Sequence, residues 1–191
     1  MIIHTHSAIG HLLYSYITEN TNIVLDKKHF ILGNIKPDIN HSLRSIPHRS
    51  KDIIDVMECL KDELVNRNQS VETFSLKLGI LCHFLSDTFC RYHFEDHLWE
   101  RNIVEHVKYE ISLHYTFMTA SKHSKSTVIN SRNEHFDDFC LTYKHFAKSY
   151  KESKKNLIRD TDHALMFSVS VINLINHEVL AKNPYMLLKI V

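Results

Sequence analysis

Apolar residues recur at three- and four-residue intervals along most of the chain, which is the spacing of one face of an α-helix. The pattern predicts six or seven helices, at about 6–19, 23–34, 50–66, 70–89, 96–123, 133–150 and 155–181. Only three Gly and three Pro occur among the 191 residues, so turn signals for β-hairpins are scarce. We therefore expect an all-α fold, a single-domain multi-helix bundle over residues 1–191.

The segment that begins at Ser70 is apolar on nearly every face. Its large apolar residues are Phe74, Leu76, Leu78, Ile80, Leu81, Phe84, Leu85 and Phe89. A helix of this kind lies in the centre of a bundle, whereas segment 50–66, with Ser50 as its expected N-cap, has one apolar stripe. The central segment also contains His83 and Asp87. A buried carboxylate requires an ionic partner or a metal ion, so this helix is the first place to look for chemistry.

Two stretches do not fit the helical pattern. Residues 36–49 contain Pro37 and Pro47 in a polar context, which predicts a loop of the kind that often carries functional side chains. Segment 185–191, YMLLKIV, is apolar, and packing of this tail on the bundle is favoured over a lipid contact.

The overall composition gives no sign of a nucleic-acid-binding protein. The chain has a formal net charge of +1, and its only basic cluster, at 151–159, is interpreted as a solvated helix junction rather than a nucleic-acid contact. No stretch approaches the ~20 apolar residues of a membrane span. The four cysteines show no C-x-x-C spacing and the first residues do not resemble a secretion signal, so we expect a reduced, cytoplasmic protein.

Histidine is over-represented, with sixteen residues, and imidazole is the commonest metal ligand in proteins. His83 and Asp87 are four residues apart, as are His106 and Glu110, and each spacing places both side chains on one helix face. Each pair alone is typical of a local salt bridge. Two pairs with His93 between them, in the order H-x3-D-x5-H-x12-H-x3-E, favour a metal site formed by neighbouring helices.

This motif resembles that of the zinc-dependent phospholipase C family, whose secreted enzymes share a helical zinc scaffold with the S1/P1 nucleases. The segment GNIKPD, residues 33–38, also resembles the segment that intracellular members carry ahead of a metal-binding aspartate. The resemblance implies a phospholipase C/P1 nuclease-like bundle with two to three zinc ions. It implies one zinc held by Asp38, His48 and His83, with Asp87 bridging to a neighbouring zinc, and a separate zinc held by His93, His106 and Glu110. His6 would bind the ion that Asp87 bridges.

Two ligand positions stay open within this resemblance. In the secreted enzymes the processed amino terminus itself binds a zinc ion, and here His4, His11 or water could take that place, or that ion could be missing. The spacing between Asp38 and His48 is not that of the family, and His41 lies in the same predicted loop, so either histidine could be the loop ligand.

The implied reaction is phosphoester hydrolysis, in which a metal-bound hydroxide attacks phosphorus in line. Asp38 is the candidate catalytic general base, with a role as ligand only as its alternative. Glu95 and His97 could act as an acid or orient a ligand, although exposed loop residues are the simpler interpretation. The implied partner is a phosphoester substrate, including phospholipid. The alternatives are a nuclease or nucleotidase on the same scaffold, and a non-enzymatic zinc-binding protein.

Overall fold

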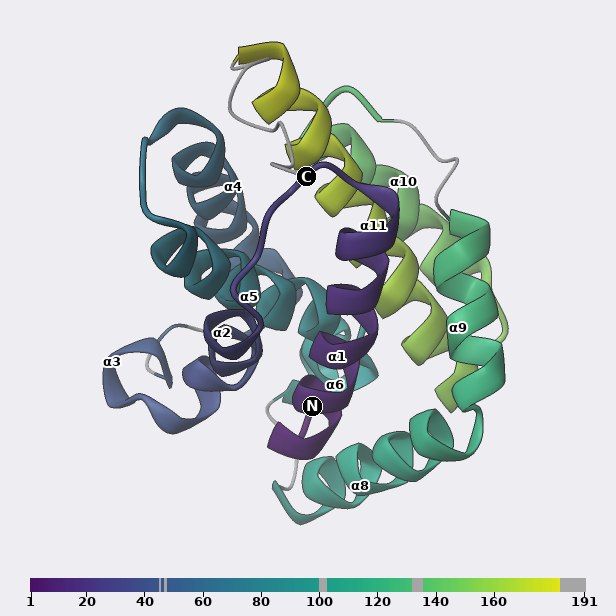
Figure 1. The fold of residues 1–191 in the computed structure, drawn as a ribbon. Helices are drawn as coiled ribbons and strands as arrows, with labels where there is room; N and C mark the ends of the chain where they lie inside the picture. Colours follow the sequence, from purple (N-terminus) through teal and green to yellow (C-terminus); the bar gives the residue numbers. More distant parts are fainter. Residues whose placement is uncertain (45, 47, 100–102, 132–135, 183–191) are drawn as a thin grey trace.

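The computed structural model describes the chain except residues 45, 47, 100–102, 132–135 and 183–191, and the described part is helical with no strand (Figure 1). The expected all-α fold is confirmed. In chain order the helices are α1 (Ile3–Asn20), α2 (Lys27–Ile39), α3 (His41–Arg44), α4 (Ser50–Asn66), α5 (Val71–Thr88), α6 (Arg91–Phe94), α7 (Asp96–Trp99), α8 (Ile103–Thr119), α9 (Ser121–Asn130), α10 (Phe139–Glu152) and α11 (Leu157–Lys182).

Helix α5 is the centre of the bundle, as its sequence predicts. Every residue from Leu78 to Thr88 is buried, and α1, α2, α4 and α11 pack around the helix (Figure 1). Its first residue follows Ser70, whose side-chain oxygen accepts a hydrogen bond from the Thr73 amide at 3.2 Å, which is a standard N-cap. Polar residues in the second half of α5 are therefore withdrawn from water.

The closest helix contact in the fold joins α2 to α5 through two glycines. A Cβ atom on Gly33 would lie 2.2 Å from the Leu76 carbonyl oxygen, and one on Gly79 would lie 2.3 Å from the Phe30 carbonyl oxygen. Only glycine permits this approach of the two backbones. The crossing holds the last turn of α2, with Asp38, against the turn of α5 that carries His83.

Helix α2 extends further than the sequence indicated. Residues 36–39 were expected in a loop but form the last turn of α2, and residues 41–44 form α3. Pro37 is tolerated because a proline so close to the end removes a single hydrogen bond, and the turn still closes with the Asn40 amide donating to Lys36 at 2.9 Å. Asp38 therefore lies on a helix instead of in a loop.

Helix α4 has the expected range, but Ser50 is its first residue and not its N-cap. The Ser50 hydroxyl lies against the Thr88 carbonyl and 3.2 Å from the His93 carbonyl. Ser50 is 3 % exposed, so its hydroxyl is satisfied by these backbone groups rather than by water. The side chain fastens α4 to the end of α5 and to α6.

The expected long helix at 96–123 is interrupted. Within it the structure has α7, α8 and the beginning of α9, and the last two are separated at Ala120, whose φ and ψ of −91° and 25° are not helical. Figure 1 shows that the chain changes direction between α8 and α9. The helix expected at 133–150 begins instead at Phe139, with Asp138 as its cap.

Helix α11, with 26 residues, is long and apolar enough to span a membrane by those two criteria alone. Of its most apolar window, with a mean hydropathy of 1.4, 56 % is buried inside the fold. The core helix of a bundle meets the same criteria, so the expected absence of a membrane span stays a prediction. The apolar tail at 185–191 lies outside the described residues.

Candidate metal centre

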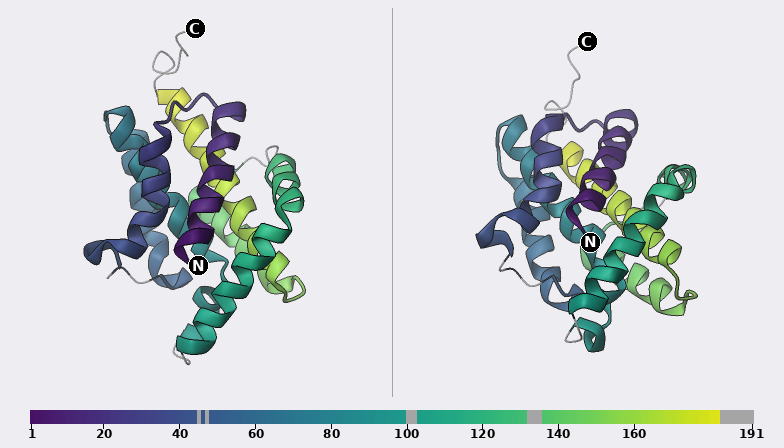
Figure 2. Two further views of the ribbon diagram at one scale, coloured as in Figure 1. Left: turned by 60° about the horizontal axis from the view of Figure 1, so that its bottom comes forward. Right: turned by 90° about the horizontal axis from the view of Figure 1, so that it is seen from below.

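The candidate ligands meet at one end of the bundle and come from five helices, α1, α2, α5, α6 and α8, and from the segments before α4 and after α5. Figure 2 shows this end, with the start of α1 between the last turn of α2 and α8. Three sets of side chains converge here, each with ligand atoms within 4.8 Å of one another. The sets are His6, His83 and Asp87; Asp38, His48 and His83; and Cys90, His93 and Glu110.

The first set is built on α5. His83 Nε2 lies 3.5 Å from Asp87 Oδ2 across one helical turn, and both residues are buried. His6, from the first turns of α1, stacks on the His83 ring with 3.8 Å between centroids, and its Nε2 lies 3.3 Å from Asp87 Oδ1. Both imidazoles therefore point their Nε2 atoms at the Asp87 carboxylate.

Hydrogen bonds to the other ring nitrogen decide what each Nε2 can do. The Nδ1–H of His83 donates to the Asn34 carbonyl at 2.9 Å. The Ser86 hydroxyl donates to the His83 carbonyl at 2.9 Å, so it accepts from the Nδ1–H of His6 at 3.2 Å. In a neutral imidazole this leaves the Nε2 lone pair of both rings free. Such oriented histidines are characteristic of metal sites.

Asp38 and His48 complete the second set. Asp38 Oδ1 lies 3.9 Å from His83 Nε2, and the His48 ring is 5.4 Å from the His83 ring. The structure thus brings His48, rather than His41, to the centre, because His41 is exposed at the start of α3. His48 is therefore the one of the two histidines that lies beside His83.

The third set consists of Cys90, just before α6, His93 on α6 and Glu110 on α8. His106, also on α8, belongs to none of the three sets but contacts Glu110. Glu110 Oε1 lies 2.9 Å from His106 Nε2 and 3.3 Å from His93 Nε2. The Nδ1–H of His93 donates to the His48 carbonyl at 3.1 Å, which orients Nε2 toward Glu110. Tyr92 stacks on His106 at 4.9 Å and fixes that ring.

The amine of Met1 lies between the carboxylates of Asp87 and Glu110. It contacts Asp87 Oδ1 and is 3.1 Å from Glu110 Oε1, with no exposed surface. His4 and His11, the alternatives considered for this position, are both exposed and belong to none of the three sets. The structure therefore places the backbone amine, and neither histidine, beside Asp87.

The charged groups of the centre perturb one another. Burial lowers the pKa of the Met1 amine, but Asp87 and Glu110 oppose this and leave its pKa well above the usual value. Burial raises the pKa of Asp87, yet the Met1 amine and the neighbouring histidines hold it well below the usual value.

The remaining groups respond mainly to desolvation. Burial lowers the pKa of His83 well below normal and also lowers the pKa of His48, so both favour the neutral form that a metal requires. Burial raises the pKa of Asp38, and Asp87 and Glu110 add to this effect.

Buried polar atoms without partners show that the residues present fit a metal ion. Among the described residues, Nε2 of His6, His48 and His83 and Oδ2 of Asp38 are buried and make no hydrogen bond. Leaving four such atoms unpaired in one place is energetically unfavourable. The atoms are imidazole nitrogen and carboxylate oxygen, which are ordinary zinc ligands. Cations held by the first two sets would satisfy all four atoms.

Several residues considered in the sequence lie away from the centre. His97 is exposed and pairs with Glu95 at 3.6 Å, while Glu95 also binds Lys155 at 2.9 Å on the surface. Within the basic cluster at 151–159, the lysines are exposed but Arg159 is buried against Asp160. The expected solvated junction is thus correct except for its last residue.

One residue of the centre, Cys90, was not predicted as a ligand from the sequence. Cys90 is buried and belongs to the third ligand set, but it was considered only as part of a cysteine count. The available signal was the short spacing of Cys90 and His93, C-x2-H, which resembles the close ligand pairs of zinc sites.

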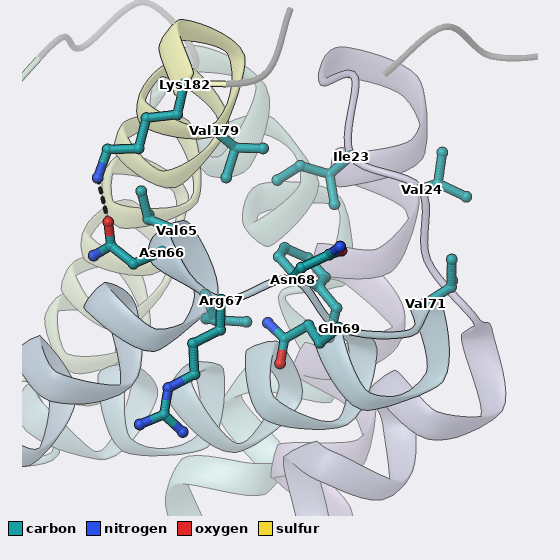
Figure 3. A pocket seen from close by; sticks show the side chains of 12 residues that line it. Ile23, Val24, Val65, Asn66, Arg67, Asn68, Gln69, Val71, Val179 and Lys182 are labelled. Atoms are coloured by element: carbon teal, nitrogen blue, oxygen red, sulfur yellow. Dashed lines mark hydrogen bonds between the residues drawn. The ribbon is translucent and has the colours of Figure 1, made fainter. Parts of the chain in front are cut away.

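A separate pocket lies at the opposite end of α1. Figure 3 shows this cavity of about 250 Å³ near Ile23 and Gln69, where Lys182 donates to Asn66. His6 lies in the first turns of α1 and Ile23 beyond its last turn, so the length of that helix, roughly 27 Å, separates the pocket from the centre. Its lining residues include no histidine and no acid.

Sequence comparison gives one informative match. The profile of the family described as zinc dependent phospholipase C matches residues 5–163, a range that includes all eight expected ligand positions. Neither the curated proteins nor the solved structures contain a significant match.

Proposed function

Because the chain belongs to the zinc-dependent phospholipase C family, we propose that it is a zinc-dependent hydrolase of phosphoesters, with phospholipid as its substrate class. The observation that carries this proposal is the group of buried Nε2 atoms on His6, His48 and His83, which make no hydrogen bond among the described residues and face carboxylates. An ordinary buried salt bridge would not leave these atoms unpaired.

The residues divide into two binding clusters. His6, Asp38, His48, His83 and Asp87 would hold one or two ions. His93, His106 and Glu110 would hold another. Zinc supplies, when bound, a lowered pKa for coordinated water and neutralisation of phosphoryl oxygens. Two to three ions per chain are therefore proposed.

Asp38 is the proposed general base. Its side chain is 22 % exposed, against 3 % for Asp87, so it is the carboxylate of the first cluster that water and substrate can reach. The raised pKa caused by burial makes it a stronger base than an exposed aspartate. A role as ligand only predicts that Asp38→Asn loses zinc, whereas a base predicts retained zinc and lost hydrolysis.

An apolar surface beside the centre favours lipid over nucleic acid. The helix that carries His106 and Glu110 exposes Ile103, Val104, Val107, Ile111, Tyr115 and Met118. At 100° per residue these six positions fall within an arc of about 120°. A nucleic-acid site would be expected to show basic side chains there instead.

The test compares metal content and turnover. Wild type is expected to bind about two to three zinc ions and to hydrolyse both a chromogenic phosphodiester and phosphatidylcholine vesicles. His83→Ala and His106→Ala should each lose zinc and activity. His145→Ala is the matched control, because His145 is an exposed histidine on α10 outside the centre.

Each other outcome identifies a different error. Metal-free wild type would end the proposal. Zinc without hydrolysis of any phosphoester would indicate a non-enzymatic zinc-binding protein. Hydrolysis of single-stranded DNA in preference to the vesicles would indicate a nuclease on the same scaffold.

A further inference from the structure

Cys90 is the only cysteine of the described residues that lies among candidate metal ligands. Its Sγ, a ring nitrogen of His93 and a carboxylate oxygen of Glu110 all lie within 4.8 Å of one another. Because the His93 Nδ1–H donates to the His48 carbonyl, the nitrogen that faces Glu110, at 3.3 Å, is Nε2. Three different donor types therefore face one small volume.

Backbone hydrogen bonds fix the position of Cys90. Its amide donates to the Asp87 carbonyl at 2.9 Å, and its carbonyl accepts from the His93 amide at 2.8 Å. The residue has extended φ and ψ of −76° and 124° and forms the corner between α5 and α6. The corner brings the thiol within 4.8 Å of the ligand atoms of His93 and Glu110.

Cys90 lies in the buried hydrophobic core. Cys90 has no exposed surface, and its Sγ makes no hydrogen bond to any described residue. Thiolate sulfur is a strong zinc ligand, and cysteines two to four residues from another ligand are typical of zinc sites. The cluster of His93, His106 and Glu110 offers three ligands, while zinc prefers four in a closed tetrahedral site.

We propose that Cys90 is the fourth ligand of the metal ion held by His93, His106 and Glu110. On binding, the S–H bond breaks, the sulfur–metal bond forms and the proton is released to solvent. The inference rests on the proposed zinc centre and not on its substrate.

The chain contains a matched control. Cys82 lies on α5, is as fully buried as Cys90, and belongs to no ligand set among the described residues. Replacing Cys82 or Cys90 by serine makes the same chemical change in the same helical region. Only the Cys90 change removes a sulfur from the metal centre.

Cobalt substitution reads the ligand directly. The full chain, with Cys59 and Cys140 replaced by serine to remove the less buried thiols, is freed of metal and loaded with Co²⁺. A thiolate ligand produces a sulfur-to-cobalt charge-transfer band in the near ultraviolet, which nitrogen and oxygen ligands do not. We expect this band in the parent protein and in Cys82→Ser, and its loss in Cys90→Ser and Cys90→Ala. Circular dichroism checks that each variant is folded.

The outcomes separate this inference from the proposed function. Cobalt d–d bands without the charge-transfer band in the folded parent protein would overturn the role of Cys90 and leave the centre of histidines and carboxylates intact. Retention of the band in Cys90→Ser would also overturn it. Failure of the parent protein to bind cobalt at all would overturn both proposals.

Discussion

Asp87 and Asp160 are both almost fully buried, at 2 % and 1 % exposure, but their surroundings differ in kind. Asp160, on α11, accepts hydrogen bonds from the Tyr150 hydroxyl at 2.7 Å and from Arg159 Nη2 at 2.7 Å, and the Tyr109 hydroxyl binds its other oxygen. Protein donors satisfy this carboxylate completely. It is a structural ion pair.

Asp87 is surrounded by side chains whose own hydrogen bonding is incomplete. His6 and His83 direct Nε2 atoms at it, and those atoms make no hydrogen bond among the described residues. The comparison teaches that burial of a carboxylate is not the mark of a metal centre. The mark is a set of oriented neighbours whose nitrogen atoms make no hydrogen bond among the described residues, and of these two regions the one around Asp87 has it.

The largest expected effect concerns the structural pair. Asp160→Ala in metal-free protein should lower the free energy of unfolding by about 3–5 kcal/mol, because Arg159 is left buried and unpaired. Urea unfolding in the presence of a chelator measures this, and zinc binding by the folded variant should not change. The double variant Arg159→Leu, Asp160→Leu is the control and should recover much of the loss. A loss below about 1 kcal/mol would show that Asp160 is not a structural ion pair.

The second prediction applies the converse test to Asp87. Zinc at a hundredfold excess over its dissociation constant should stabilise wild type by about 2.7 kcal/mol. Asp87→Asn should lose most of this zinc-dependent increment, because it removes the carboxylate that His6 and His83 share. Thermal unfolding with and without zinc measures the increment. Asp160→Asn, the matched control, should keep it; equal increments in the two variants would refute the distinction drawn between the regions.

A smaller effect is expected at the α2–α5 crossing. Gly33→Ala should destabilise the protein by about 1–3 kcal/mol, since its Cβ would meet the Leu76 carbonyl at 2.2 Å. It should also weaken zinc binding by moving Asp38 away from His83. Gly10→Ala is the control: its Cβ would approach only the Asn34 side chain, at 3.0 Å, which can shift. Zinc titration and urea unfolding measure both effects. Unchanged zinc affinity in Gly33→Ala would show that the crossing does not position Asp38.

The sequence predicts the regions with local signals well. Helical periodicity identified α5 as the central helix, and the four-residue spacing of His83 and Asp87 could be interpreted without knowing the fold. The expected long helix at 96–123 was less accurate, because the break at Ala120 is not marked by glycine or proline. Pro37 caused the opposite error. It predicted a loop from residue 36, but a proline in the last turn of a helix does not end the helix.

Features that depend on distant contacts were not predictable. The hydrogen bond from Tyr109 to Asp160 joins residues 51 positions apart, and no local sequence pattern predicts it. Cys90 was missed because it becomes interesting only when α8 places Glu110 beside it. His48 and His41 could not be distinguished by spacing, because the path of the chain after α2 decides which imidazole reaches His83.

The contact of Gly33 with Gly79 extends the set of residues on which the centre depends. In a saturation-mutagenesis screen scored by metal-dependent function, these two positions should be as intolerant as the imidazole and carboxylate positions, although neither has a side chain that could bind anything. An engineer who wishes to change the reactivity of the centre should therefore leave both glycines in place and vary residues near the solvent-accessible Asp38 instead.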